Sequence, residues 1–300
     1  MYVITGASGN TGSVVAHTLL DQGKQVRVIG RNVSHLSQFV DRGAEAFVTD
    51  QTNAAKLTQA FTGAEAVYAM IPPNVTLPDT FAYDEQVTSA LVAALSKSKV
   101  PYVVNLSSIG ADKPSGTGPV LGLHRQEKAL DRISGLNTLH LRAGYFMENT
   151  LGQAQTIQAM GSTGGPVRGD LKLPMIATRD IGAAAAQALL HLDFKGHQSR
   201  ELLGQRDINY DEAASIIGKQ IGKPDLKYVH LSDEQVRPAL SQMGMSLGFI
   251  GLLLEMTSSL NSGYMKALEP RSTQNSTPTS FENFVAEEFL PVYQNSSKVA

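Results

Sequence analysis

The stretch Thr5-Gly6-Ala7-Ser8-Gly9-Asn10-Thr11-Gly12 decides the fold of this chain. Its three glycines stand three residues apart, after a short apolar run and before a helix-like segment. In a dinucleotide-binding turn, such glycines permit a tight turn, backbone approach to a pyrophosphate and close helix–strand packing. The free N–H groups of the helix then face the phosphates. A turn without a ligand is the alternative, but the strand–turn–helix context favours a cofactor site. The residues expected to bind the cofactor here are Gly6, Ser8, Gly9, Asn10, Thr11 and Gly12.

Outward from this loop, the first 145 residues alternate short apolar runs with helix-like segments. The runs span residues 2–5, 25–29, 46–48, 66–70, 102–106 and 138–141, and the helix-like segments span residues 11–22, 33–42, 53–61, 79–97 and 123–133. Strand–helix repetition implies right-handed crossovers and a parallel sheet that is covered on both faces. The predicted fold class is therefore α/β, a doubly wound parallel Rossmann sheet.

The alternating pattern loosens after Gly144. We expect a helix over residues 145–160 and a loop over residues 161–166, followed by an Ala-rich helix from residue 181. Residues 1–149 are predicted to form the NADP-binding Rossmann domain. Residues near 175–205 would add the last part of its sheet. Residues 150–300 would form a smaller, partly helical C-terminal substrate module. Its apolar segment Met243–Met256 would line a pocket for a flat substrate.

Composition excludes several classes of protein. The 300 residues carry Lys+Arg 25 against Asp+Glu 27, a net charge of −2, which argues against a nucleic-acid binder. There are no cysteines, and the seven histidines are dispersed, so neither a disulfide framework nor a metal site is expected. No targeting segment is visible, and the longest apolar patch is shorter than the roughly 20 residues of a membrane span. We expect a cytoplasmic protein that does not bind membranes.

The second strand indicates which cofactor is bound. An NAD-specific Rossmann fold places an acidic residue at the end of this strand. Here the strand ends in Gly30-Arg31-Asn32, and Arg31 could clamp a 2′-phosphate unless it is only a solvated surface cation. The sequence therefore favours NADP(H). Asp50 could bind the adenine amino group or could instead cap the next helix. Met70 and Ile71 could pack beside the nicotinamide or could instead be ordinary core residues.

Four segments together resemble the NmrA-like group of atypical short-chain dehydrogenase/reductases. They are the glycine loop, Gly30-Arg31-Asn32, Asn105-Leu106-Ser107-Ser108 and the run 141–149, where Ala143 replaces the family's usual proline. Type-2 NADPH:quinone oxidoreductases and triphenylmethane reductases share this pattern. The resemblance implies NADPH bound by residues 6–12 and Arg31, and a substrate cleft between the sheet and the C-terminal module. The family contains both reductases and NADP(H)-sensing regulators.

Conventional members of the wider family carry a Y-x-x-x-K motif, and none of the nine tyrosines here has a lysine four residues later. His124 and Lys128 occupy the corresponding positions, one helical turn apart. The resemblance implies that Lys128 holds the nicotinamide ribose. His124, Ser108 or Tyr145 would then orient the acceptor, although His124 could instead fill the cleft edge and Ser108 could only cap a strand. The Gly/Pro-rich loop over residues 111–121 is a candidate lid.

These observations favour an NADPH-dependent reductase of quinones or similar conjugated acceptors, because hydride transfer to such acceptors depends less on a tyrosine acid. The substrate would be small and flat, and a homodimer is possible. A non-catalytic NADP(H) sensor is the main alternative. An isomerase or benzylic-ether reductase with Lys128 as its acid–base group is a weaker one.

Overall fold

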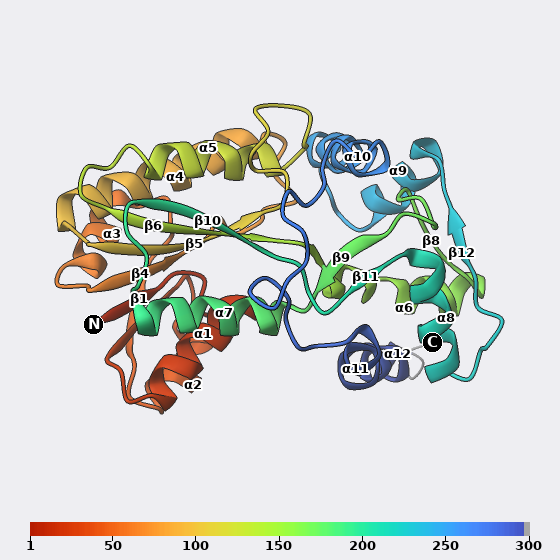
Figure 1. The fold of residues 1–300 in the computed structure, drawn as a ribbon, viewed down its shortest axis with the longest axis horizontal. Helices are drawn as coiled ribbons and strands as arrows, with labels where there is room; N and C mark the ends of the chain where they lie inside the picture. Colours follow the sequence, from red (N-terminus) through yellow and green to blue (C-terminus); the bar gives the residue numbers. More distant parts are fainter. Residues whose placement is uncertain (297–300) are drawn as a thin grey trace.

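Seven parallel strands form the central sheet of the computed structural model, which describes residues 1–296 (Figure 1). Their order across the sheet is β10-β6-β5-β4-β1-β2-β3, and every neighbouring pair is parallel. The strands are β1 Tyr2–Ile4, β2 Val26–Gly30, β3 Glu45–Val48, β4 Ala66–Ala69, β5 Tyr102–Ser108, β6 Asn137–Ala143 and β10 His197–Leu202. The prediction of a parallel Rossmann sheet is confirmed.

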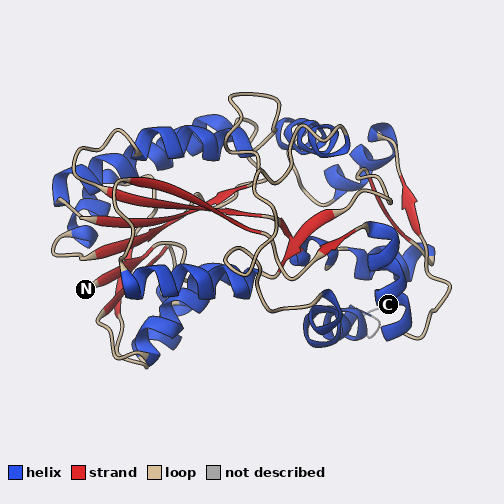
Figure 2. Cartoon of the chain, viewed as in Figure 1, coloured by secondary structure: helices blue, strands red, loops and turns tan. Residues whose placement is uncertain are grey.

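Helices cover both faces of this sheet, as a doubly wound fold requires (Figure 2). One face is covered by α1 Asn10–Asp21, α2 Ser37–Val40 and α7 Thr178–His191. The other is covered by α3 Ala54–Phe61, α4 Thr80–Ser98 and α5 Val120–Leu130. Gly23, Gly43, Gly63 and Gly135 all take positive φ after helical segments, because only glycine adopts this conformation without strain.

Two elements from the second half of the chain complete this layer structure. Strand β10 pairs with β6 along six residues at the edge of the sheet. Helix α7 packs against α1 so closely that a Cβ added at Gly182 would lie 2.6 Å from the Cβ of Val14. The Rossmann half is therefore built from two separate stretches of the chain, and residues 145–176 of the C-terminal half lie between them in sequence.

The remaining elements pack around a second hydrophobic core. They include two small sheets, ordered β11-β9-β7 and β12-β8. The strands are β7 Tyr145–Phe146, β8 Thr163–Gly165, β9 Leu173–Ile176, β11 Asp207–Ile208 and β12 Tyr228–His230. The helices are α6 Gln153–Met160, α8 Tyr210–Gln220, α9 Asp233–Gln242, α10 Leu247–Asn261, α11 Phe281–Phe284 and α12 Leu290–Ser296, with a π-helical turn over Val285–Phe289 between the last two.

The structure corrects two expectations in this region. The predicted helix over residues 145–160 is strand β7, a 3₁₀ turn over Met147–Thr150 and then α6, because Tyr145 and Phe146 pair with β9. The predicted loop over residues 161–166 contains β8, which pairs with β12 more than 60 residues later. Within residues 1–296, no helix is long and apolar enough to cross a membrane, and no three His, Asp or Glu side chains gather as a metal site.

Candidate cofactor and substrate site

The glycine loop has the backbone geometry that a dinucleotide needs. Gly6 takes φ +61°, and a Cβ at Gly12 would lie 2.3 Å from the carbonyl oxygen of Gly6. Gly9 precedes α1 in an extended conformation, and no described side chain caps the helix. The N–H groups of its first turn are therefore available to an anion, as a pyrophosphate site requires.

The side chains of the loop divide into two groups. Ser8 and Asn10 are exposed beside the first turn of α1. Thr11 is buried, and its hydroxyl accepts a hydrogen bond of 2.8 Å from Tyr68. Thr11 therefore braces the loop against β4 through its side chain, whereas its backbone N–H belongs to the uncapped helix end.

Arg31 and Asp50 lie at the ends of the second and third strands, beside Tyr83 of α4. Arg31 is exposed, and no ion pair of its guanidinium occurs among the described residues. Burial and the charge of Asp50 raise the pKa of Tyr83, and the positive charge of Arg31 opposes this shift. Asp50 does not cap the following helix, because Asn53 does so and Asp50 accepts hydrogen bonds from Thr52. The three groups therefore lie close together beyond the C-terminal ends of β2 and β3.

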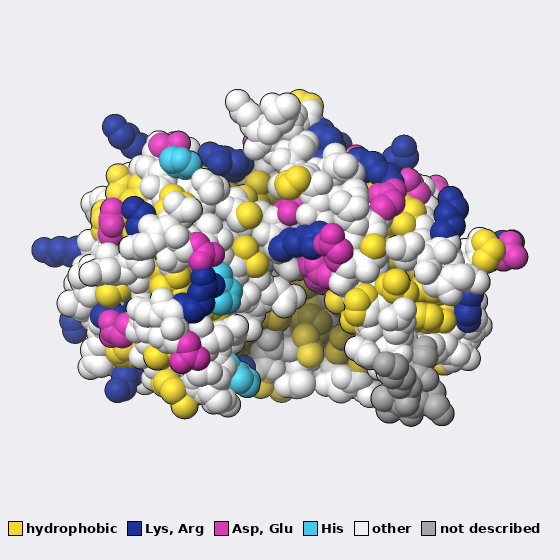
Figure 3. Space-filling view, turned by 90° about the horizontal axis from the view of Figure 1, so that it is seen from below, with side chains coloured by type: hydrophobic (Ala, Val, Ile, Leu, Met, Phe, Trp, Pro, Cys, Tyr) yellow, Lys and Arg dark blue, Asp and Glu magenta, His cyan; other side chains and the backbone are white. Residues whose placement is uncertain are grey.

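A cavity of about 710 Å³ opens beyond the C-terminal ends of β4, β5 and β6. Both halves of the molecule contribute to its wall, which is mostly apolar. Phe249, Leu253 and Met256 of α10 form part of it, as the apolar segment predicts. Seen from below, the molecule is hollowed between its two halves, and hydrophobic side chains lie in the hollow (Figure 3). Its volume lies in the range of small-molecule sites.

Met70 connects the glycine loop with this cavity. Met70 and Ile71 both line the cavity. The sulfur of Met70 also lies against Gly6, because a Cβ added at Gly6 would be 2.8 Å from it. A dinucleotide whose pyrophosphate rests on the loop could therefore extend its nicotinamide past Met70 into the cavity.

Two of the predicted substrate-orienting residues line the cavity. Tyr145 receives a hydrogen bond from the hydroxyl of Tyr210 at 3.1 Å. Burial raises the pKa of Tyr145, an effect that hydrogen bonds from Tyr210 and Asn149 oppose. The hydroxyl of Ser108 donates to the carbonyl of Ile109 at 3.0 Å, so it retains only acceptor capacity for a ligand.

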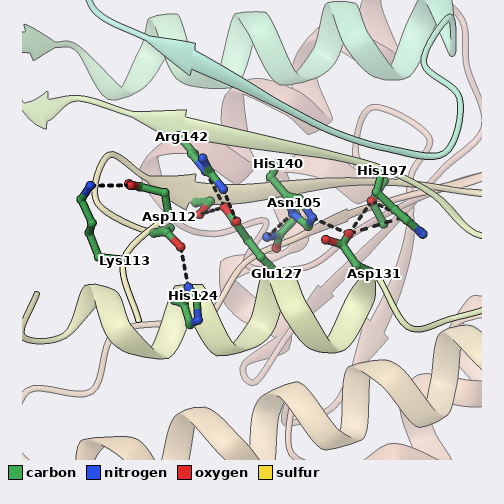
Figure 4. A network of polar contacts seen from close by, with 12 residues as sticks. Asn105, Asp112, Lys113, His124, Glu127, Asp131, His140, Arg142 and His197 are labelled. Carbon is green, nitrogen blue, oxygen red and sulfur yellow. Dashed lines mark hydrogen bonds and ion pairs between the residues drawn. The ribbon is translucent and has the colours of Figure 1, made fainter. Parts of the chain in front are cut away.

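The structure does not bring His124 and Lys128 to the cavity wall. His124 is half-buried, and its Nδ1 contacts the carbonyl oxygen of Ala111 at 2.8 Å (Figure 4). Because a carbonyl can only accept, Nδ1 carries the proton, and the ring braces the loop after β5. Lys128 is exposed, since the neighbouring Glu127 occupies the buried position of that turn of α5.

Glu127 holds α5 against the sheet, a role that was missed in the sequence. Its carboxylate accepts hydrogen bonds from Ser107 at 2.6 Å and from Arg142 at 2.6 and 3.0 Å (Figure 4). A bidentate pair of this kind fixes orientation. Val120 and Leu123 of the same helix line the cavity.

Asp84 of α4 is the second residue that was missed. This residue is only 9% exposed and lines the cavity, as does Thr80 one turn earlier. Helical spacing could have identified it, because Asp84 lies on the same face of α4 as the buried residues Val87, Leu91 and Leu95. A carboxylate on the apolar face of a helix indicates a special role.

Fold and site together define a dinucleotide-binding Rossmann protein with an apolar cavity beside its cofactor loop. The NmrA-like family model matches residues 2–290, so the chain belongs to the NmrA-like family.

The chain is 28% identical to an NAD(P)H azoreductase of Xenophilus azovorans, over 82% of each chain. It also resembles an NADPH-dependent quinone oxidoreductase of Escherichia coli solved with NADPH, with 25% identity, TM-score 0.83 and coverage of 96% of this chain and 100% of that one. The triphenylmethane reductase of Citrobacter sp. shares the fold at 19% identity and TM-score 0.77, over 96% and 100% of the two chains.

Proposed function

We propose that this protein is an NADPH-dependent reductase that transfers a hydride to a quinone or a similar flat conjugated acceptor. The observation that carries the proposal is the apolar cavity of about 710 Å³ that adjoins the glycine loop through Met70. The relatives named as NAD(P)H-dependent reductases support the same class of enzyme.

The residues of the chain have separate tasks in this proposal. Gly6, Gly9 and Gly12 let the loop and the first turn of α1 bind the pyrophosphate, and Arg31 pairs with the 2′-phosphate. When bound, NADPH supplies the hydride. The walls formed by Met70, α10 and Tyr145 hold the acceptor in position and exclude water, which supplies much of the acceleration for an acceptor of this kind.

The NADP(H) sensor remains the alternative function. A sensor needs no space for a second ligand beside the cofactor, whereas the apolar wall of this cavity continues beyond Met70 to Tyr145 and α10. The weaker alternative that uses Lys128 as acid–base group has no support, because Lys128 is exposed. The cytoplasmic location and the homodimer stay predictions.

The test follows the nicotinamide absorbance of NADPH and NADH during incubation with benzoquinones, naphthoquinones and triphenylmethane dyes. We expect acceptor-dependent oxidation of NADPH that is faster than oxidation of NADH. Arg31→Gln should weaken NADPH binding by about 10- to 100-fold, because it removes a charge-assisted contact, and should leave NADH binding unchanged. Lys24→Gln, which removes another exposed positive charge near the N-terminus, is the matched control. Tight NADPH binding without turnover of any acceptor would favour the sensor.

A further inference from the structure

The wall of the cavity contains the carboxylate of Asp84, a residue that also lines a second, smaller cavity with Gly122 and Arg125. Asp84 of α4 is 9% exposed, and no hydrogen bond or ion pair of its carboxylate occurs among residues 1–296. The positive charge of Arg125 on α5 acts on the Asp84 carboxyl group without a hydrogen bond. The Arg125 guanidinium lies 4.8 Å from the ring centroid of Phe81. Burial of an unpaired carboxylate is costly, so a polar ligand at this place would relieve it.

The neighbouring helix leaves space for this carboxyl group. Gly122 of α5 faces Asp84, and a Cβ at that position would lie 2.2 Å from its Oδ2. Any other residue at position 122 would push the carboxyl group aside. The glycine therefore allows an acidic side chain to sit between α4 and α5 at the edge of the cavity.

A second unsatisfied polar group lies beside the carboxylate. Thr80, one turn earlier on α4, also lines the cavity and is 6% exposed. Its hydroxyl is buried and has no hydrogen-bond partner within the described part of the chain. Residues four apart share one face of a helix, and both of these residues line the cavity. The hydroxyl of Thr80 and the protonated carboxyl group of Asp84 can both donate to an oxygen of a bound acceptor.

We propose that Asp84 is the proton donor of this site and that Thr80 hydrogen-bonds the same acceptor oxygen. This inference rests on the proposed reductase function and supplies the acid that the missing Y-x-x-x-K tyrosine would otherwise provide. His124 is not placed for that role, because it does not line the cavity and its Nδ1–H donates to the carbonyl of Ala111.

The step balances for a quinone. Hydride transfer adds two electrons and one proton, and it leaves a negative charge on the quinone oxygen. The O–H bond of the Asp84 carboxyl group breaks, its proton forms the second hydroxyl of the hydroquinone, and the carboxylate recovers a proton from water. A cationic triphenylmethane dye needs no such proton, since hydride addition to its central carbon already gives a neutral product.

The surroundings of Asp84 keep it protonated to unusually high pH. Burial raises its pKa to about 6, and the positive charge of Arg125 on α5 opposes this shift. On its own helix, Tyr83 and Glu85 are the adjacent titratable groups. The other charged residues lining the cavity belong to the C-terminal half, and they are Lys172, Asp207, Lys266, Glu269 and Arg271.

The experiment compares quinone and dye reduction by Asp84→Asn and wild type. We expect kcat for the quinone to fall by about 100-fold or more, and kcat for the dye to stay unchanged. In the wild type, kcat for the quinone should fall as pH rises through about 6, and the dye should lack this dependence. Glu85→Gln is the matched control, because it removes an exposed carboxylate from the same helix.

A readout without turnover is the titration of aspartate carboxyl carbons by NMR in the cofactor-free protein. One carbon should titrate near pH 6, and its signal should be missing from Asp84→Asn. Gly122→Ala, which displaces the carboxyl group, should also lower kcat for the quinone and spare the dye.

Equal losses for quinone and dye, or no loss for either, would overturn the role of Asp84 while the reductase function stands. If the wild type reduces no acceptor, the proposed function fails and the donor role fails with it.

Discussion

The burial of Asp84 has a consequence for stability that is independent of catalysis. A carboxyl group whose pKa is higher in the folded than in the unfolded chain binds a proton more tightly when folded. Here the shift is from 3.8 to about 6, so the free energy of unfolding should fall as pH rises through this window and then level off. The lost stability reflects an ionised carboxylate that the fold leaves unpaired.

Asp84→Asn should therefore be as stable as the wild type or more stable at pH 7 to 8. Its free energy of unfolding should also lack the decline between pH 4 and 6 that we attribute to Asp84. Urea unfolding at intervals across this range measures both effects. Glu85→Gln should keep the wild-type dependence, because Glu85 is exposed. A decline of unchanged size in Asp84→Asn would mean that other groups cause it.

Individual residues also show where inference from sequence alone stops. The spacing of Gly6, Gly9 and Gly12 predicts a cofactor loop, because these glycines act through the backbone and need no particular side-chain orientation. Glu127 and Lys128 are adjacent on one helix, and Glu127, which pairs with Arg142 of the sheet, is the buried one. Spacing places both on α5, but it does not give the rotation of the helix against the sheet.

At the scale of elements, α10 is held in place by contacts with two loops of the Rossmann half. Ser246 at its N-terminus donates from its backbone N–H to Val75 at 2.9 Å and from its hydroxyl to Leu77 at 2.6 Å. A Cβ at Gly118 would lie 2.0 Å from the carbonyl oxygen of Leu252 in α10. The helix that lines the cavity is thus fixed by backbone approaches that only glycine permits.

Gly248→Ala tests this arrangement within α10 itself. A Cβ at Gly248 would lie 2.3 Å from the carbonyl oxygen of Pro78, so we expect a loss of about 1–3 kcal/mol in the free energy of unfolding and weaker acceptor binding. Gly251→Ala is the matched control, because nothing lies within 4 Å of its Cβ. This control should be neutral or gain up to about 1 kcal/mol from helix propensity. Equal effects of the two substitutions on unfolding would contradict the packing argument.

The elements that sequence predicts best are those with local signals. The six N-terminal strands and most of their helices follow from periodicity, because buried parallel strands and amphipathic helices each have a characteristic pattern. Strands β7 to β9 have two to four residues each and exist through pairing with distant segments. Their own sequence carries too little information to distinguish them from a helix end or a loop.

At the scale of the whole molecule, the chain leaves the Rossmann half and returns to it. It crosses into the C-terminal half after β6 and comes back for α7 and β10. The buried face of α7, with Ile181, Ala185 and Leu189, belongs to the same core as α1 and β1. The cavity lies where the chain crosses, so its walls come from segments far apart in sequence. The apolar helix α10 could be predicted from its own composition, whereas the sequence does not show that α4 borders the same cavity.

We therefore propose that residues 1–149 do not form an independently folding domain, although they carry the cofactor loop. A fragment of these residues would expose the face of α1 that α7 covers and the edge of β6 that β10 pairs with. We expect it to lack a cooperative thermal transition in circular dichroism and dispersed amide signals in NMR. Residues 1–149 joined by a flexible linker to residues 178–205 should recover both, because this restores the seven-stranded sheet and its covering helix. Cooperative unfolding of the 1–149 fragment alone would show that the first six strands are sufficient.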